Sequence, residues 1–531
     1  MPVSTLYRNG RITTLDPEVP EVPAMAVRDG TVVHVGSEDG ARAALAGDEV
    51  RVRDLRGRRV FPGFIDAHAH LALFSIEQAN LALKPLTSLS AILETVRGAA
   101  LRAPADSWIR GSGYNHLTLP EHRHPTRADL DRVSPRHPVV LTRTCGHIAA
   151  VNSEALRRAG VSLHAPDPPG GRFDRNPDGT INGVLYDQAL AAVQAASAPG
   201  EEELIGWMDG GSRLWAQAGI TAFHDAGGPP GYFQALGRAY AAHRIPQRVD
   251  AMVWNGLGVN QLDGFLHAQI GTGFHRGEFH IGAAKVMLDG SSSGPTAATR
   301  EPYRLDPSFF GILYHEADAV RDLMTRAAAR GFQLTAHAVG DRAVELAART
   351  IAATGVRERR NRIEHAAMCP PDLTALLAAA GITPVAQPAF LYEFGDGYLD
   401  SYGEERGAAL FPLRSWLAAG LRVAGSSDSP VSDYRPLAGI AGAMARVTRG
   451  GQVLAPSERV DFPEALRLYT ETPAWLAMAE HRLGRLQAGF RANLVAVADD
   501  VTTMDDVNDI RECPVVLTVI HDEIVHGDES R

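Results

Sequence analysis

Apolar and polar side chains alternate in short runs at both ends of the chain. In residues 1–60, the stretch MAVRDGTVVHVG places Asp29-Gly30 between two apolar runs. An Asp-Gly pair between alternating runs predicts a β-hairpin. The same pattern returns from about residue 484, in RANLVAVA and CPVVLTVIHDEIVHGD. Because chain termini often lie close together, we expect 1–60 and 484–531 to form one composite β-sandwich.

The long middle segment, 61–483, alternates short apolar strands with alanine-rich helical stretches. This order predicts an α/β fold with a parallel sheet, and eight strands match a (β/α)8 TIM-like barrel. The expected strands are 60–68, 220–226, 247–254, 279–288, 332–340, 361–368, 382–390 and 422–430. An open doubly wound sheet stays an alternative, although no G-x-G-x-x-G follows the first strand to indicate a dinucleotide site.

An insertion separates the first two expected strands. The first ends at 68 and the second begins at 220, and this distance is far more than one helix needs. We therefore expect an insertion within about 71–200, a stretch rich in Pro, Gly and His. Insertions after a barrel strand lie at the C-terminal face, where active sites form, so this one should cover the active site.

Composition and charge narrow the class of protein. The chain has 531 residues, of which 45% are hydrophobic, and a net charge of −10. It has no basic stripe, so we expect no nucleic-acid partner, and no apolar run of ~20 residues that would span a membrane. Without an apolar leader, and with Cys145, Cys369 and Cys513 far apart, we expect a cytoplasmic protein with reduced thiols.

The strongest candidate for chemistry is FPGFIDAHAH, which ends an expected strand with His68 and His70. Side chains alternate along a strand, so the two imidazoles point the same way while Ala69 points away. Two converging neutral imidazoles are typical of a metal site. Taken alone, the pair fits two partly exposed histidines at a strand end equally well.

Three further residues occupy corresponding positions. His337 in LTAHAVGD, His365 in RIEHA and Asp428 in AGSSDSP each end an expected strand. The C-terminal ends of barrel strands converge on one face. Because the eighth strand closes the barrel beside the first, we expect Asp428 near His68 and His70, as a metal ligand and general base.

Lys285 lies inside the apolar strand AAKVML. Only two of the 52 basic residues are lysines, Lys84 and Lys285. A buried ammonium needs a carboxylate partner, and Asp289 is one candidate. The alternative is a carbamate formed from carbon dioxide on the ε-amine, which arginine cannot provide. A carbamate would add a negative bridging ligand where an ammonium would be repelled by metal.

These motifs together resemble the amidohydrolase superfamily, in the branch that includes the N-substituted formamide deformylases. The similar segments are PGFIDAHAH, GHIAAVNSEAL, KVMLDG, HAVGDRAV, RIEHA, GSSDSP and the return TETPAWLAM…LGRLQAGFRANLVAV. The resemblance covers nearly the whole chain and implies a metal-binding barrel with a composite β-sandwich. It implies that the metal ligands are His68, His70, His337, His365 and Asp428, with Lys285 as the carboxylated bridge.

The resemblance also implies one or two zinc ions, with another divalent metal as the alternative, and a small-molecule substrate. We expect hydrolysis of a non-peptide C–N bond in an amide or formamide by a metal-activated hydroxide. Ester or lactone hydrolysis and deamination at the same site stay open. A non-catalytic binding protein is a further alternative. Loss of a metal-binding residue would favour it, but the sequence retains every expected metal ligand. A homo-oligomer also stays open, since no motif marks an interface.

Substrate contacts are less well defined by the sequence. Asn115, His147, Asp289 and Gln387 are candidates, and a structural role explains each of them equally well. Two departures from the branch are expected to border the substrate pocket: SSSGPTAA follows Gly290 where relatives often show an SLGSRTA-like run, and Asp187 stands where relatives commonly carry glutamate. Both departures bear on the identity of the substrate rather than on the chemistry.

Overall fold

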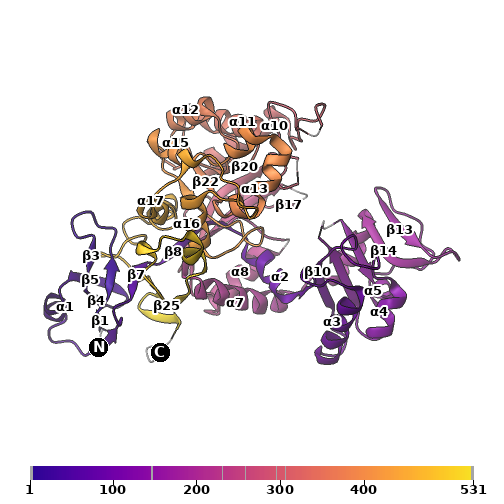
Figure 1. Cartoon of the computed structure of the whole chain (residues 1–531), viewed down its shortest axis with the longest axis horizontal. Helices are drawn as coiled ribbons and strands as arrows, with labels where there is room; N and C mark the ends of the chain where they lie inside the picture. The colour runs from indigo at the N-terminus through magenta and orange to yellow at the C-terminus, as the bar shows by residue number, and fades with distance from the viewer. Residues whose placement is uncertain are drawn as a thin grey trace. The chain divides into compact units, whose positions relative to one another are not determined.

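The computed structural model describes residues 4–144, 147–229, 231–256, 259–294, 296–304 and 306–527. The chain forms two compact units, one of residues 1–71 with 209–531 and the other of residues 72–208 (Figure 1). Cys145 lies outside the described residues, whereas Cys369 and Cys513 are free and buried. Within the described ranges, no helix is both long and apolar enough to cross a membrane.

Eight parallel strands form the barrel of the first unit, as the sequence predicted. Their order in the sheet is β23-β22-β21-β20-β19-β16-β15-β8. The barrel closes between β8 and the segment after β23, where the Asp428 N–H donates to the His68 carbonyl at 2.7 Å. The strands are β8 (Phe64–Ala69), β15 (Ile220–Asp225), β16 (Arg248–Gly256), β19 (Phe279–Met287), β20 (Leu334–Ala338), β21 (Arg362–His365), β22 (Thr383–Ala386) and β23 (Ala424–Gly425).

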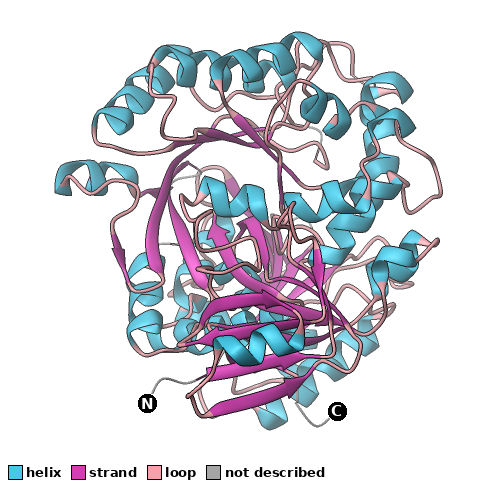
Figure 2. Cartoon of the chain, turned by 90° about the vertical axis from the view of Figure 1, so that its left-hand side faces the viewer, coloured by secondary structure: helices cyan, strands magenta, loops and turns pink. Residues whose placement is uncertain are grey.

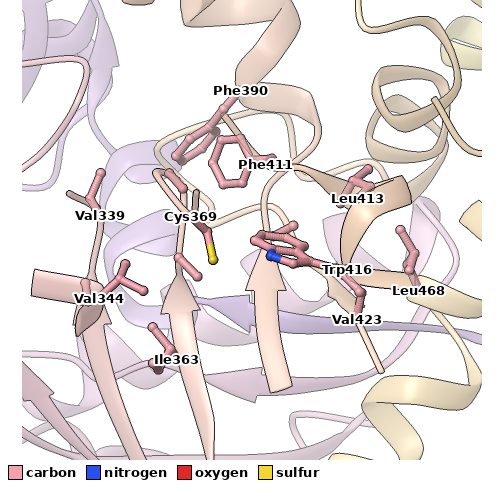
Figure 3. Close-up of a cluster of buried hydrophobic side chains, with 14 of the residues drawn as sticks. Val339, Val344, Ile363, Cys369, Phe390, Phe411, Leu413, Trp416, Val423 and Leu468 are labelled. Carbon is pink, nitrogen blue, oxygen red and sulfur yellow. The ribbon is translucent and has the colours of Figure 1, made fainter. Parts of the chain in front are cut away.

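Amphipathic helices follow the barrel strands (Figure 2). In α11 (Asp341–Ala353), the buried residues Val344, Ala347, Ala348 and Ile351 recur at helical spacing and join the main hydrophobic core. Figure 3 shows part of this core, with Trp416, Phe390 and Cys369 among its side chains. Other helices of this unit include α1 (Glu38–Ala44), α8 (Tyr232–Ala241), α9 (Leu262–Ala268), α10 (Ala317–Ala329), α12 (Pro371–Ala380), α13 (Ala389–Tyr402), α14 (Glu404–Ala408), α15 (Leu413–Ala418), α16 (Pro436–Ala445), α17 (Phe462–Leu468), α18 (Glu471–Leu476) and α19 (Val507–Glu512).

Strands from both ends of the chain build a β-sandwich beside the barrel. A four-stranded sheet has the order β5-β4-β1-β6, and a six-stranded sheet has the order β26-β25-β24-β7-β2-β3. Tyr7 and Val27 of the first sheet share a core with Val60 and Leu494 of the second. The strands are β1 (Ser4–Arg8), β2 (Arg11–Thr13), β3 (Glu21–Val22), β4 (Ala24–Arg28), β5 (Thr31–Gly36), β6 (Val50–Asp54), β7 (Arg59–Pro62), β24 (Leu494–Val497), β25 (Val515–Ile520) and β26 (Glu523–His526).

The structure divides the predicted strand 60–68 between these two bodies. β7 pairs with β24 in the sandwich, whereas β8 pairs with β15 in the barrel. Gly63 lies at the crossing, where a Cβ would approach the Thr221 side chain to 2.3 Å. Glycine allows this close passage because it has no Cβ. The apolar run 60–68 is therefore two strands that belong to different sheets.

The insertion forms the second unit, with a six-stranded sheet in the order β13-β14-β12-β11-β10-β9. Its position over the active site stays a prediction. The strands are β9 (Leu81–Ala82), β10 (Ile109–Tyr114), β11 (Val139–Arg143), β12 (Ile148–Val151), β13 (Gly171–Arg175) and β14 (Ile181–Asp187), and the helices include α3 (Leu89–Arg102), α4 (Arg127–Val133) and α5 (Ser153–Arg158).

Candidate metal centre

The structure brings the predicted metal ligands together at the C-terminal ends of the barrel strands. The centres of the His68 and His70 rings are 5.4 Å apart, those of His68 and His365 are 5.0 Å apart, and those of His337 and His365 are 4.5 Å apart. Asp428 Oδ1 lies 3.3 Å from His68 Nε2 and 3.4 Å from His70 Nε2. His68, His70 and Asp428 thus offer donor atoms within 4.8 Å of one another, a spacing that could hold a metal ion.

Unusual backbone angles turn two of these side chains into the site. Glu364 and His365 are consecutive, and a regular strand would send them to opposite faces. His365 instead has a φ of 71°, and both side chains approach His68. Asp428 has a φ of 54° in the loop that follows β23. Residues other than glycine rarely adopt this left-handed region, and such strain is typical of functional positions.

Each histidine is held through one ring nitrogen. The acceptors behind the rings are carboxylate, carbonyl or amide oxygens, so the nitrogen that faces them carries the hydrogen. The other nitrogen of each ring then keeps its lone pair, as in histidines that bind metal. The contacts are His68 Nδ1 to Glu364 Oε2 at 2.6 Å, His70 Nδ1 to the Gly227 carbonyl at 2.8 Å, His337 Nε2 to the Gly290 carbonyl at 3.0 Å, and His365 Nδ1 to Gln387 Oε1 at 2.8 Å.

Burial and neighbouring charges set the protonation of the site. Burial lowers the pKa of His365 to about 4 and holds the pKa of His337 well below its ordinary value. Both imidazoles are therefore neutral near pH 7, as metal binding requires. Although burial opposes it, the neighbouring His68 and His70 hold the pKa of Asp428 well below its ordinary value. Asp428 is thus an ionised carboxylate in the same cluster as the neutral rings of His337 and His365.

Lys285 faces the same cluster from β19. It is 2% exposed, and its Nζ lies 3.1 Å from His68 Nε2. In the described part of the chain, no carboxylate oxygen lies within 4.0 Å of this Nζ, and burial lowers the pKa of the amine. The ion pair with Asp289 that the sequence allowed is absent there, because Asp289 accepts hydrogen bonds from the backbone of Ala298, Val339 and Gly340.

Two of the predicted substrate contacts are fully buried in the barrel unit. Asp289 and Gln387 are both 0% exposed. Gln387 holds His365 through Oε1 and donates through Nε2 to Ser426 Oγ at 2.8 Å. Asp289 cross-links the loops that follow β19 and β20 and lies 3.6 Å from His337 Nε2. Both residues support predicted ligands in this structure, and their contact with a substrate stays a prediction.

The other two predicted substrate contacts belong to the insertion unit. Asn115 accepts a hydrogen bond from the Arg143 guanidinium at 3.0 Å, and His147 Nδ1 lies 3.2 Å from Asp187 Oδ1. The Asp187 that departs from the branch pattern is thus the partner of His147. Contact of Asn115 and His147 with a substrate also stays a prediction.

Sequence reasoning missed the residues that hold the histidines. Glu364 is a buried charge next to His365, and Asp66 lies within FIDAHAH two residues before His68. A charged residue in an apolar strand was the signal that singled out Lys285, and it applied to Glu364 equally. The carbonyls of Gly227 and Gly290 carry no sequence signal, because any residue has a carbonyl.

Comparison with known proteins agrees with this geometry. The sequence profile of the amidohydrolase family matches residues 51–526, which is most of the chain. The chain belongs to the amidohydrolase family. This amidohydrolase is 29% identical to the putative amidohydrolase YtcJ of Bacillus subtilis (strain 168), with 99% of each chain covered. It is 30% identical to the N-substituted formamide deformylase of Arthrobacter pascens, with 96% of each chain covered.

Solved structures extend the comparison. An uncharacterized metal-dependent hydrolase from Pyrococcus furiosus is 26% identical, with a TM-score of 0.79, and the match covers 94% of this amidohydrolase and 100% of that chain. Family, fold and the clustered donor atoms together identify a metal-dependent hydrolase.

Proposed function

We propose that this amidohydrolase is a zinc enzyme that cleaves a non-peptide C–N bond in an amide or formamide. One observation carries the proposal: four buried or half-buried imidazoles gather with the Asp428 carboxylate, and each is fixed through one nitrogen so that the other can keep its lone pair. Buried histidines that only pack would not need this common arrangement.

The donor set fits zinc. Neutral imidazole nitrogens and carboxylate oxygens are ligands that zinc prefers, and the second ring nitrogen of a zinc ligand usually donates to an oxygen. We assign His68, His70, His337, His365 and Asp428 as the residues that hold one or two ions. A bound divalent metal would polarise a carbonyl oxygen and make water nucleophilic near neutral pH.

Lys285 is the proposed source of a further ligand. Its buried amine has a lowered pKa and has no close carboxylate in the described ranges, so it can lose its proton. The free amine would add to carbon dioxide, forming an N–C bond and releasing one proton. The product is a carbamate with a negative charge, which suits a metal site better than an ammonium.

Asp428 is the proposed proton carrier. It is ionised at neutral pH, and its Oδ1 lies 3.3 Å from His68 Nε2 and 3.4 Å from His70 Nε2. Its free carboxylate oxygen can accept the proton of the attacking water and then deliver it to the leaving nitrogen. An amine leaving group requires this second transfer, so the arrangement suits C–N cleavage.

One full-length relative supports the proposed substrate class. The full-length relative from Arthrobacter pascens is named for deformylation of N-substituted formamides. A shorter match, 39% identical over 23% of the chain, is to the imidazolonepropionase of Symbiobacterium thermophilum. We propose a small formamide or amide as the substrate and the cytoplasm as the location.

A substrate panel tests the proposal. Zinc-loaded protein should release amine from N-substituted formamides or simple amides faster than it hydrolyses matched esters and lactones or deaminates aminated heterocycles. A chelator should abolish this release, and added zinc should restore it. Amide hydrolysis that persists after complete metal removal would contradict the metal mechanism, and preference for esters would contradict the C–N assignment.

A further inference from the structure

A buried ion pair lies in the barrel interior beside the histidines. Arg362 and Glu364 stand two residues apart on β21, and their side chains are 1% and 0% exposed. Arg362 Nε lies 2.6 Å from Glu364 Oε1, and Arg362 Nη2 donates to Glu364 Oε2 at 2.9 Å. A buried pair often costs more to desolvate than its attraction returns, so stability alone does not explain it.

Glu364 reaches across the barrel to the metal site. Its Oε2 lies 2.6 Å from Nδ1 of His68, which belongs to β8, and its Oε1 accepts from Thr335 Oγ1 on β20 at 2.6 Å. β21 and β8 are not neighbours in the sheet, so the contact with His68 crosses the interior. Donors from three strands therefore fix the carboxylate in one position.

Arg362 is fixed in turn by β8 and β15. Its Nη2 donates to the Ala67 carbonyl, and its Nη1 donates to His224 Nδ1 at 2.7 Å. Burial, together with Arg362, lowers the pKa of His224 to about 3, so this ring is neutral and Nδ1 accepts. Neither end of the Arg362–Glu364 pair is free to rotate.

We propose that Glu364 is a positioning residue of the metal site, acting through His68. Its carboxylate keeps the hydrogen of His68 on Nδ1 and aims Nε2 toward Asp428 Oδ1 at 3.3 Å and Lys285 Nζ at 3.1 Å. Arg362 holds Glu364 in place for this purpose. The inference rests on the proposed function, in which His68 is a ligand.

The other histidines have weaker supports. His70 and His365 donate to neutral oxygens, those of Gly227 and Gln387, at 2.8 Å. Glu364 instead offers a carboxylate oxygen at 2.6 Å from His68, and the Arg362 guanidinium pairs with the same carboxylate. A carboxylate behind a ligating imidazole raises its basicity, and loss of such a partner typically weakens metal binding roughly 10–100-fold.

Glu364→Asp is the informative variant. Aspartate keeps a negative charge beside Arg362 but withdraws it from His68 by one methylene. We expect the zinc Kd, measured by competition with a chromophoric chelator, to rise roughly 10–100-fold. Glu364→Gln is less suitable, because it leaves Arg362 buried without a counter-charge and threatens folding.

Arg248 and Asp250 provide a matched control. They form a pair with the same two-residue spacing on β16, in which Arg248 is buried and Asp250 is half-buried, with Nε and Oδ2 2.9 Å apart. In the described structure, neither residue hydrogen-bonds a proposed ligand. Asp250→Asn should therefore lower Tm but leave the zinc Kd within about threefold of wild type. Equal zinc Kd values for wild type and Glu364→Asp, or an equal rise in Asp250→Asn, would overturn the proposal.

A measurement without metal separates this inference from the proposed function. In metal-free protein with ¹⁵N-labelled histidine, at a pH high enough for the His68 ring to be neutral, the His68 signals, assigned by their loss in His68→Gln, should show the hydrogen on Nδ1. Glu364→Asp should shift the ring toward the other tautomer, and an unchanged tautomer would contradict the positioning role. A wild type without zinc affinity would contradict the proposed function, whereas the tautomer result would still decide the role of Glu364.

Discussion

The Asp66 carboxylate on β8 accepts hydrogen bonds from both the backbone N–H and the side-chain hydroxyl of Ser427, the residue before Asp428. Ser427 Oγ donates to Asp66 Oδ2 at 2.5 Å, and Ser427 N donates to Asp66 Oδ1 at 3.2 Å. Asp66 Oδ1 also accepts from the His68 N–H at 3.0 Å. One carboxylate thus fixes the backbone beside two proposed ligands at the point where the barrel closes.

Removal of the Ser427 hydroxyl should loosen this closure. In Ser427→Ala, the buried Asp66 loses its shortest hydrogen bond, and a lost bond to a charged group is worth about 1.5–3 kcal/mol. We expect a lower Tm and a zinc Kd that rises roughly tenfold, since supporting residues affect metal affinity. Ser429→Ala is the control, because Ser429 Oγ is buried without a hydrogen-bond partner in the described chain. Equal effects of the two substitutions would contradict the role of Asp66.

Lys285 should determine how many zinc ions the protein holds. Wild type, grown with zinc and bicarbonate, should contain near two zinc per chain by elemental analysis if the carbamate bridges them. Lys285→Arg should contain one or fewer, because arginine keeps its charge and cannot form the carbamate. Lys84→Arg, at the other lysine of the chain, is the control and should retain the wild-type content. A zinc content that Lys285→Arg does not alter would leave Lys285 with a structural role.

Replacement of Asp428 by Asn should separate catalysis from metal retention. Asparagine keeps the size and one oxygen donor but cannot carry the proton, and general acid–base catalysis typically contributes roughly 10²–10⁴-fold. We expect kcat to fall by that factor, while the zinc content stays near wild type because four histidines remain. Turnover close to wild type would exclude Asp428 as the proton carrier.

Sequence alone predicted the elements whose pattern is local. The eight barrel strands follow from apolar runs, and the histidine cluster follows from residues at corresponding strand ends. The sandwich follows from the same alternation at both termini. Each of these inferences needs only the periodicity of a strand and the convergence of strand ends in a barrel.

Features that depend on distant residues escaped prediction. The run 60–68 reads as one strand because its break at Gly63 arises from the approach of Thr221, which is far away in the sequence. The sequence suggested that Asp289 pairs with Lys285. The Asp289 carboxylate instead accepts hydrogen bonds from backbone N–H groups, and such groups carry no sequence signal. The role of Glu364 requires knowing that β21 faces β8 across the barrel.

Asp500 should make the stability of the sandwich depend on pH. Arg59 Nε lies 3.0 Å from Asp500 Oδ1, and although burial opposes them, hydrogen bonds from Arg59 and Thr502 lower the pKa of Asp500 to about 2. Because the folded-state pKa lies below the ordinary 3.8 of the unfolded chain, the contribution is present above about pH 4 and is lost as the pH falls toward 2. It amounts to at most ~2 kcal/mol. The difference in Tm between wild type and Asp500→Asn should therefore be larger at pH 7 than at pH 3, as calorimetry can measure.

The neighbouring Asp499 is exposed and serves as the control, so Asp499→Asn should leave Tm unchanged at both pH values. An effect of Asp500→Asn that does not depend on pH would show that packing rather than charge stabilises the contact with Arg59.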